Sequence, residues 1–141
     1  MLTILSALLE SAVEHAQREH PREACGVIAA VQGSRRPSRF VPMINKAQSP
    51  TFFEFDPQEQ LRVWREMEER DEEPLVIYHS HTHSAAFPSK DDVLFANEPR
   101  AHYLIISTAP DCEVAVRSFR IIEAKVTEET IQVLPAYATA Q

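Results

Sequence analysis

The sequence is poor in glycine, with only Gly26 and Gly33 among its 141 residues. Gly-rich phosphate loops and dinucleotide-binding turns need several glycines in one short segment, so both kinds of nucleotide site are excluded. Cysteine is equally scarce, and two cysteines exclude a disulfide scaffold and a zinc module built from paired CxxC motifs. Because no export signal is recognisable, we expect both thiols, Cys25 and Cys112, to be free.

Positive charge is in the minority, since 14 Lys and Arg stand against 21 Asp and Glu, for a net charge of −7. This balance argues against nucleic-acid binding, which leaves a basic patch on a protein. No stretch approaches the roughly 20 apolar residues that a membrane helix needs. The start of the chain also lacks the basic residues that precede the apolar core of a signal peptide. We therefore expect a cytoplasmic protein that binds neither nucleic acid nor membrane.

The remaining composition is that of an ordinary globular protein, with 44% hydrophobic and 25% charged residues. A chain of this length can bury a hydrophobic core without disulfides or a structural metal. No internal repeat, low-complexity tract or linker divides the sequence. We therefore predict one domain over residues 1–141, with a frayed tail over 136–141.

Hydrophobic periodicity predicts three helices. Over residues 3–20 apolar side chains recur three and four positions apart, and Thr3 can cap the start of this helix. Asp56 can cap a second helix that has Pro57 at its first position. We expect the charge run at 66–73 to form the solvated end of this second helix. A third, short helix is expected over 89–97.

Six segments have the composition of strands. The segment 24–32 consists of small and β-branched residues and is expected to be buried on both faces. The apolar run 75–79 is typical of a central strand. Pro42 cannot donate a ladder hydrogen bond, so its strand is expected at a sheet edge. The expected strands are 24–32, 39–45, 75–79, 102–108, 113–122 and 125–134. The predicted fold class is α/β (α+β), a mixed β-sheet flanked by helices.

The most informative segment is YHSHTHSAAFPSKDD, residues 78–92, which begins inside the predicted central strand. Alternate residues of a strand point to the same side, roughly 6.5–7 Å apart, so two neighbouring imidazoles can converge on one metal ion. A carboxylate, from Asp91 or Asp92, can complete the set. Two histidines and one carboxylate leave the fourth zinc position open to water, as in catalytic sites. The candidate histidines are His79, His81 and His83.

Residue types alone leave the ligand set open, because either neighbouring pair of these histidines, or all three, could bind. Ser89 and Asp92 could instead form a near capping box at the next helix. His15 and His20 are more typical of surface positions, and His102 of packing or hydrogen bonding. The same donor types also hold iron in non-haem oxygenases. A zinc deaminase is excluded, because the PCxxC cysteines are missing.

The spacing His79-x-His81, followed by Ser89 and Asp92, resembles the His-x-His-x7-Ser-x-x-Asp signature of the JAMM (MPN+) zinc metallopeptidases, with all four elements intact. The upstream segment HPREACG resembles the glutamate segment of this family and aligns its glutamate with Glu23. The resemblance extends over nearly the whole chain. It implies the JAMM/MPN fold, which is similar to that of cytidine deaminases.

The resemblance also implies roles for the matched residues. Ser89 matches the serine that hydrogen-bonds the site water and later the oxyanion, and Glu23 matches the general base. His83 matches no family ligand, and Asp91 remains a solvated charge at a helix start. Cys25, beside the glutamate, is more typical of a small core residue than of a nucleophile. The residues that match the zinc ligands are His79, His81 and Asp92.

Members of this family cut amide bonds at the C-terminal tails of ubiquitin-like proteins. The segments PREACGV, SPTFFEFDP and YHSHTHSAAFPS are similar to those of bacterial members that act on sulfur-carrier proteins. This resemblance implies hydrolysis after the C-terminal Gly-Gly of a carrier, with release of cysteine or another residue. One alternative is a trimming peptidase that unmasks the carrier tail for a secondary-metabolite pathway. An alternative of another class is a non-catalytic MPN scaffold, although such scaffolds usually lack a ligand.

Overall fold

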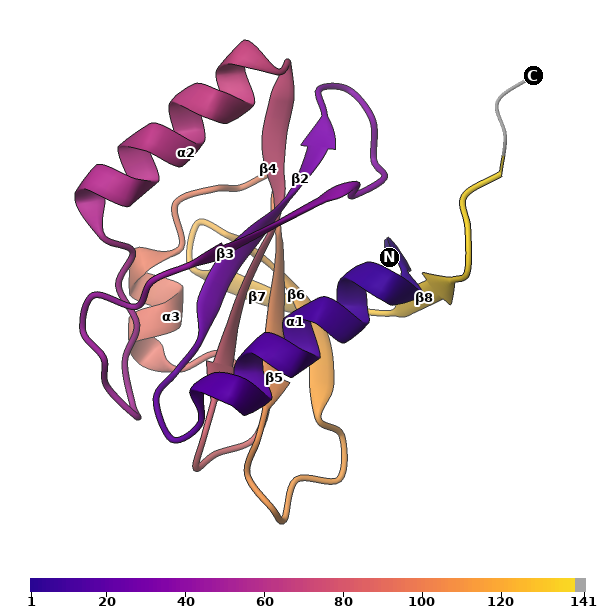
Figure 1. Cartoon of the computed structure of the whole chain (residues 1–141). Helices are drawn as coiled ribbons and strands as arrows, with labels where there is room; N and C mark the ends of the chain where they lie inside the picture. Colours follow the sequence, from indigo (N-terminus) through magenta and orange to yellow (C-terminus); the bar gives the residue numbers. More distant parts are fainter. Residues whose placement is uncertain (139–141) are drawn as a thin grey trace.

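The computed structural model describes residues 1–138, and a six-stranded mixed sheet forms its centre (Figure 1). The strand order is β3-β2-β4-β5-β6-β7. β4 and β5 pair in parallel, whereas the other neighbours in this sheet are antiparallel. The strands are β2 (Cys25–Val31), β3 (Arg39–Met43), β4 (Glu72–His81), β5 (His102–Ser107), β6 (Val116–Ile122) and β7 (Lys125–Glu129).

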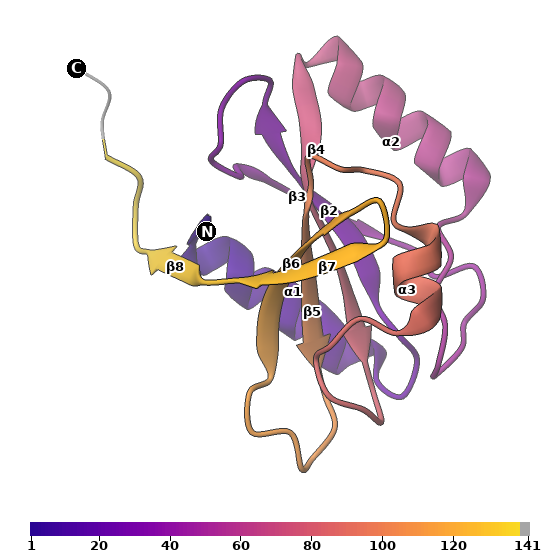
Figure 2. The ribbon, with the colours of Figure 1, turned by 180° about the vertical axis from the view of Figure 1, so that it is seen from behind.

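Helices cover both faces of this sheet (Figures 1 and 2). Helix α1 (Ser6–Glu19) packs on one face, where Ala12 and Ala16 meet Val76 and Tyr78 of β4. Helices α2 (Pro57–Glu69) and α3 (Lys90–Phe95) lie on the opposite face. Successive β4 residues alternate between the two faces, so the odd-numbered residues point toward α2 and α3. None of the helices in the described residues is long and apolar enough to cross a membrane.

Several sequence predictions are confirmed in this sheet. The apolar run predicted as a central strand lies in β4, between β2 and β5, and all its residues from Leu75 to His81 are buried. The strand that contains Pro42 is at the sheet edge. Asp56 caps α2, because its Oδ2 accepts a hydrogen bond from Glu59 N at 3.0 Å. The mixed sheet flanked by helices is therefore confirmed.

The first predicted helix begins too early. Residues Leu2–Leu5 form a strand, β1, that pairs in parallel with β8 (Ile131–Leu134) in a separate two-stranded sheet. Thr3 therefore lies in a strand and does not cap α1, whose N-cap is Leu5 without a side-chain hydrogen bond. The single strand predicted over 125–134 is also wrong. These residues divide between β7, which belongs to the central sheet, and β8, which pairs with β1.

Three further predictions need correction. Glu72 and Glu73 lie in β4 rather than at the solvated end of a helix, because their backbone pairs with β2, and Glu72 Oε1 accepts from Arg39 Nη2 at 2.7 Å. His15 is buried, not a surface residue, and its Nδ1 lies 2.7 Å from the Tyr78 hydroxyl. Residues 139–141 of the predicted frayed tail lie outside the described residues. Within the described part, Tyr137 donates a hydrogen bond to Pro37 O, so fraying is wrong at that position.

Candidate metal centre

Three donor groups converge at the carboxyl end of β4. The Nε2 atoms of His79 and His81 lie 3.1 Å apart, and they lie 3.1 and 3.0 Å, respectively, from Asp92 Oδ2. Among the described residues, these three form the one cluster of histidine, cysteine or carboxylate side chains close enough to share a metal ion. The sequence left Asp91 and His83 as alternatives, but the structure brings neither of them into this cluster.

Local structure explains the convergence. His79 and His81 are two residues apart on a strand, so both project from the same face. Asp92 is the third residue of α3 and belongs to a capping box with Ser89. The Asp92 carboxylate accepts a hydrogen bond from Ser89 N at 2.8 Å, and Ser89 Oγ accepts one from Asp92 N at 3.1 Å. The predicted capping box is thus confirmed, and it coexists with the metal-facing position of Asp92.

The two imidazoles are held in a defined orientation. His81 Nδ1 donates to Ala85 O at 2.9 Å, so its Nε2 carries the free lone pair. The ring of Phe53 stacks on the ring of His79, with centroids 4.5 Å apart and an interplanar angle of 23°. Both histidines are almost completely buried, at 2% and 4% exposure. The sequence had assigned no role to Ala85 or Phe53, which become neighbours of the ligands only through the fold.

The donor set fits a tetrahedral metal ion. Ligands that bind zinc at about 2.0–2.1 Å lie roughly 3.3 Å from one another, close to the 3.0–3.1 Å observed. Each of the three facing atoms offers a lone pair when it is unprotonated, and no further side chain of the described residues hydrogen-bonds to them. A cation at their centre would satisfy all three. Two imidazole nitrogens and one carboxylate oxygen are typical of zinc sites that keep an open position.

Electrostatics favours an anionic Asp92. Burial opposes ionisation of this carboxyl, but hydrogen bonds with His79 and His81 outweigh it and hold its pKa well below the ordinary value. Burial lowers the pKa of His79. For His81, burial has the same tendency, but the contacts with Asp92 and Ala85 O outweigh it and raise the pKa. The centre therefore combines an ionised Asp92 carboxylate with a neutral His79 imidazole.

Glu23 lies between α1 and β2 and is only 5% exposed. Its backbone N donates to Ser49 O at 2.9 Å. Burial raises the pKa of the Glu23 carboxyl to about 8, while the nearby charges of His81 and Asp92 lower and raise it, respectively. A carboxyl whose pKa lies near neutrality can both accept and return a proton. This is the chemistry expected of a general base beside a metal centre.

Asn45 is a residue of this region to which the sequence assigned no role. Its Nδ2 donates to Glu23 O at 3.0 Å and to Phe52 O at 2.9 Å. Its Oδ1 accepts from Ala47 N at 3.0 Å and from Glu54 N at 3.1 Å. One buried amide thus ties the 46–54 loop to the backbone of Glu23. The signal was present in the sequence only as a polar residue at the end of the strand predicted over 39–45.

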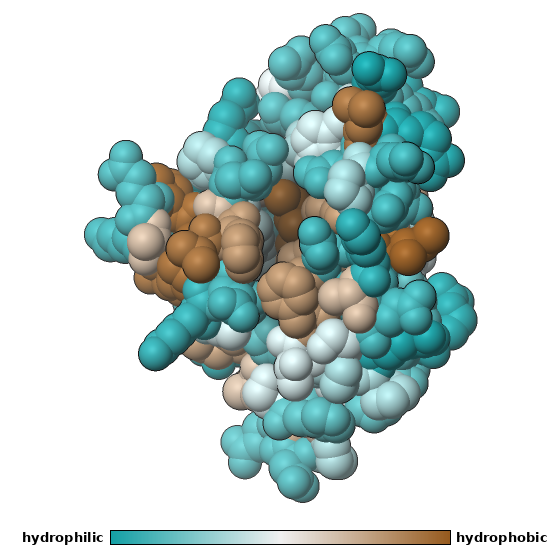
Figure 3. Space-filling view, turned by 90° about the vertical axis from the view of Figure 1, so that its left-hand side faces the viewer, coloured by the Kyte–Doolittle hydropathy of each residue, from teal (hydrophilic) through white to brown (hydrophobic). Residues whose placement is uncertain are grey.

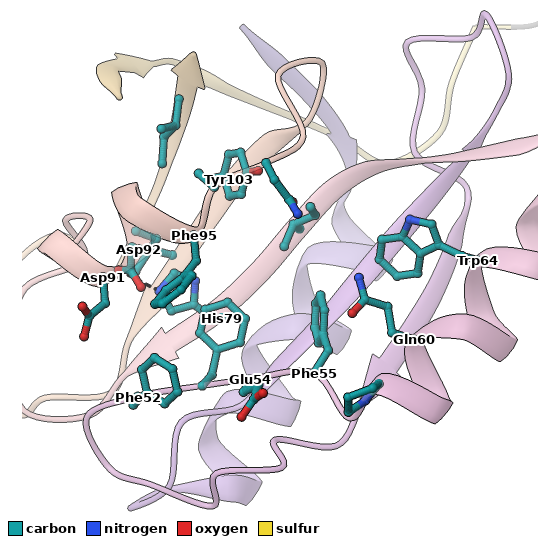
Figure 4. A pocket seen from close by; sticks show the side chains of 17 residues that line it. Phe52, Glu54, Phe55, Gln60, Trp64, His79, Asp91, Asp92, Phe95 and Tyr103 are labelled. Carbon is teal, nitrogen blue, oxygen red and sulfur yellow. Dashed lines mark ion pairs between the residues drawn. The ribbon is translucent and has the colours of Figure 1, made fainter. Parts of the chain in front are cut away.

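A cavity of about 400 Å³ lies beside the metal centre, between the 52–55 segment, α2, α3 and β5 (Figure 4). His79, Asp91 and Asp92 line one end of it. The space-filling view shows hydrophobic residues gathered around a hollow on the face that α2 and α3 border (Figure 3). The aromatic residues that line the cavity are Phe52, Phe53, Phe55, Trp64, Phe95 and Tyr103.

The remaining candidates lie away from the centre. His83 is exposed, and its ring lies 6.3 Å from that of His20, which is exposed as predicted. Cys25 is a buried core residue and, like Cys112, a free thiol, as expected. His102 hydrogen-bonds through its Nδ1 to Glu129 Oε2 at 2.6 Å, which confirms the predicted hydrogen-bonding role.

Known proteins are similar to this chain over most of its length. The chain is 50% identical to the CysO-cysteine peptidase of Mycobacterium tuberculosis over 137 residues, which covers 97% of this chain and 94% of the relative. It is 33% identical to a probable TtuB-protein conjugate cleaving protease of Thermus thermophilus, covering 89% of this chain and 79% of the relative.

Solved structures are similar as well. A protein of Desulfitobacterium hafniense is 33% identical and superposes with a TM-score of 0.81, covering 96% of this chain and 94% of that chain. A JAB1/MPN domain protein from Archaeoglobus fulgidus shares the fold at 17% identity, with a TM-score of 0.63 and coverage of 94% and 98%. The family described as "Prokaryotic homologs of the JAB domain" matches residues 5–122. The chain therefore belongs to this family, and the resemblance to JAMM/MPN proteins is confirmed.

Proposed function

We propose that this protein is a zinc-dependent peptidase that hydrolyses the amide bond after the C-terminal Gly-Gly of a ubiquitin-like sulfur-carrier protein. The released group is cysteine or another C-terminal residue. The observation that carries the proposal is the convergence of His79, His81 and Asp92 beside a buried Glu23. The 50% identity to a CysO-cysteine peptidase supports this choice of substrate.

The residues of the centre have separate roles in this proposal. His79, His81 and Asp92 would hold the zinc ion. Bound there, zinc supplies a water ligand of pKa near 7 and polarises the scissile carbonyl. Glu23 accepts the proton of the attacking water and returns it to the leaving amine. Because Glu23 is already buried and its pKa is raised to about 8 before any metal binds, it is suited to exchanging protons.

In this proposal, Ser89 stabilises the oxyanion of the substrate. Its Oγ accepts from Asp92 N at 3.1 Å, which leaves the hydroxyl proton free to donate. A donor of this kind typically contributes about 3 kcal/mol to the transition state. No side chain of the enzyme becomes acylated, so chelators should inhibit the reaction and serine or cysteine reagents should not.

The same centre would serve a trimming peptidase that unmasks a carrier tail, so the identity of the released residue distinguishes that alternative. A non-catalytic scaffold is disfavoured, because the donor set is intact. We also propose that residues 1–141 act as one domain in the cytoplasm, in accordance with the sequence expectations. The match of the family over residues 5–122 supports the proposed domain extent.

The test compares wild type with Glu23→Gln. Glu23 is not a ligand, so both proteins should contain about one zinc ion per chain by elemental analysis. Wild type should remove the terminal cysteine from a CysO–cysteine adduct, as followed by intact mass. Glu23→Gln should be slower by a factor of about 10² to 10⁴.

Glu19→Gln is the matched control, because Glu19 has a part-exposed side chain at the end of α1 and pairs with Arg22. It should cleave like wild type. Turnover of Glu23→Gln at the wild-type rate would contradict the base assignment. A wild-type protein that holds no zinc after reconstitution would favour the scaffold.

A further inference from the structure

We propose that His20 and His83 bind the free α-carboxylate of the residue that leaves, and so favour hydrolysis of the last peptide bond of the carrier. This inference rests on the proposed function and deepens it, because it names the residues that recognise the released group. It assigns a role to two exposed histidines that neither the metal centre nor the catalytic steps use.

The position of Glu23 indicates where the leaving residue lies. Glu23 returns a proton to the leaving amine, so this amine must lie within hydrogen-bond reach of its carboxyl. His79 and Asp92 line the cavity beside the centre, whereas Glu23 is not among the lining residues. The acyl part of the substrate therefore extends on the cavity side, and the leaving residue lies on the Glu23 side.

The leaving residue brings a negative charge to this side of the centre. In a C-terminal residue the carboxyl carbon is two covalent bonds from the scissile nitrogen, so the α-carboxylate must lie close to Glu23. The ionised Asp92 carboxylate repels a second carboxylate nearby. Hydrogen-bond donors that contact the α-carboxylate offset this repulsion. An enzyme that releases a terminal residue therefore needs donors on the Glu23 side.

Two imidazoles meet on this side. His20 precedes Glu23 by three residues, so their Cα atoms are at most roughly 11 Å apart. His83 follows the ligand His81 by two residues, and neither His20 nor His83 lines the cavity. Their ring centroids are 6.3 Å apart at an interplanar angle of 83°. A carboxylate between the two rings can accept one N–H from each, at about 2.9 Å.

His20 is oriented by the segment that follows β5. Its Nδ1 lies 2.7 Å from Thr108 Oγ1, and Thr108 N donates to His81 O at 2.9 Å. These contacts attach the end of α1 to the end of β4, and both ends lie at the lower edge of Figure 1. With Nδ1 engaged by the hydroxyl, Nε2 of His20 is the nitrogen left for a ligand.

His83 lies between two anchored neighbours. Thr82 Oγ1 donates to Pro50 O at 2.8 Å. Ser107 Oγ donates to Ser84 O at 2.7 Å. The backbone on both sides of His83 is therefore fixed, while its ring is exposed. An alanine at this position removes nothing from the hydrophobic core, so the variant should fold.

The experiment compares two forms of CysO that end in Gly-Gly-Cys, one with a free terminal carboxylate and one with a carboxamide, which removes that charge. Wild type should show a kcat/KM about 100-fold higher on the carboxylate form, because each hydrogen bond to a charged group contributes about tenfold or more. His20→Ala and His83→Ala should each lose about tenfold on the carboxylate form. Both should cleave the carboxamide form at the wild-type rate.

Two further readouts separate carboxylate binding from a structural role. The loss should appear in KM rather than in kcat, because the contact forms in the bound substrate as well as in the transition state. His83→Asn keeps an N–H donor and should retain part of the preference. Zinc content and circular dichroism establish that each variant is folded and loaded.

Arg22→Ala is the matched control. Arg22 is an exposed cation in the same segment as His20, and its Nη2 lies 3.3 Å from Glu19 Oε2. Because Glu19 already engages this guanidinium, Arg22→Ala should keep the wild-type preference for the carboxylate form.

Four results would overturn the histidine site. Wild type that cleaves both forms equally well has no carboxylate recognition to explain. An unchanged preference in both alanine variants contradicts the site but leaves the proposed function intact. Loss of the preference in Arg22→Ala alone would assign the carboxylate to the guanidinium instead. Wild type that cleaves neither form, although zinc is bound, contradicts the proposed substrate and the histidine site together.

Discussion

Two buried groups in this protein combine histidine with a carboxylate, and they differ in what surrounds the polar atoms. In one, Glu129 Oε2 accepts from His102 Nδ1 at 2.6 Å and from Ser118 Oγ at 2.8 Å. The N-terminal ammonium of Met1 lies 3.1 Å from Glu129 Oε1, and Arg35 Nη2 donates to His102 Nε2 at 3.3 Å. The chain itself therefore places a hydrogen-bond partner or a positive charge beside each of these atoms.

At the other group, His79, His81 and Asp92 turn three potential ligand atoms toward one point. Outer contacts hold His81 and Asp92, through Ala85 O and Ser89 N, but no further side chain of the described residues hydrogen-bonds to the three facing atoms. Histidine and carboxylate alone therefore do not identify a metal centre. Three ligand atoms that face only one another identify it.

Of the substitutions that test this comparison, Asp92→Ala should have the largest effect, on both zinc content and activity. It removes the one anionic ligand, so bound zinc should fall from about one ion per chain to less than about a tenth. Activity should fall by more than about 100-fold, beyond the loss typical for supporting residues. Elemental analysis and peptidase assays measure both effects.

Asp91→Ala is the control for this substitution, because Asp91 is exposed and lies outside the donor cluster. It should retain zinc. If Asp92→Ala bound zinc as tightly as wild type, the third ligand would have to be Asp91 or His83.

Glu129→Gln should affect stability and leave the zinc content unchanged. Burial opposes ionisation of Glu129, but hydrogen bonds from His102 and Ser118 outweigh it and lower the pKa from 4.5 to about 2. A pKa lowered by folding stabilises the protein above pH 4.5, and this contribution is lost as pH falls toward 2. It amounts to at most about 3 kcal/mol.

The measurement is the free energy of unfolding of wild type and Glu129→Gln between pH 7 and pH 2, from denaturant titrations. The difference between the two proteins should be largest near pH 7 and should vanish near pH 2. A difference that is independent of pH would mean that ionisation of Glu129 does not contribute.

Asp56→Ala should have the smallest effect and provides a baseline for a carboxylate with one backbone partner. Asp56 accepts a hydrogen bond from Glu59 N at the start of α2. Loss of such a cap costs about 1 kcal/mol, or about 3–5 °C in Tm for a chain of this length. Thermal unfolding measures it, with Gln58→Ala as an exposed control. A loss as large as that expected for Glu129→Gln would contradict this ranking.

The sequence predicted most of the sheet, because β4 and β2 contain continuous apolar runs that lack the three- and four-residue periodicity of a helix. It missed β1, since the short apolar segment Leu2–Leu5 fits a helix as well as a strand. Its partner β8 lies at the other end of the chain, and only the fold brings the two together. It missed the burial of His15 for a similar reason, because the Tyr78 hydroxyl that it contacts is 63 residues away.

The candidate ligands are close in sequence, so their spacing predicted a metal cluster in this segment, whereas the choice of His79, His81 and Asp92 came from the family resemblance. His79 and His81 share one strand, and Asp92 follows one loop later. The supporting residues come from elsewhere: Phe53 from the loop after β3, and Asn45 at the start of that loop. Their roles depend on tertiary contacts that no local spacing encodes. The roles of Glu23 and Ser89 in catalysis stay predictions until the variants are measured.

The small sheet of β1 and β8 has a consequence for the order of folding. It joins residues that are 129 positions apart, as in the contact between Thr3 and Gln132. Closing so long a loop is entropically unfavourable until the intervening chain is already compact. We therefore expect this sheet to close after the central sheet has formed. In hydrogen exchange, the β1 and β8 amides should open before those of β4, while the metal centre is still assembled.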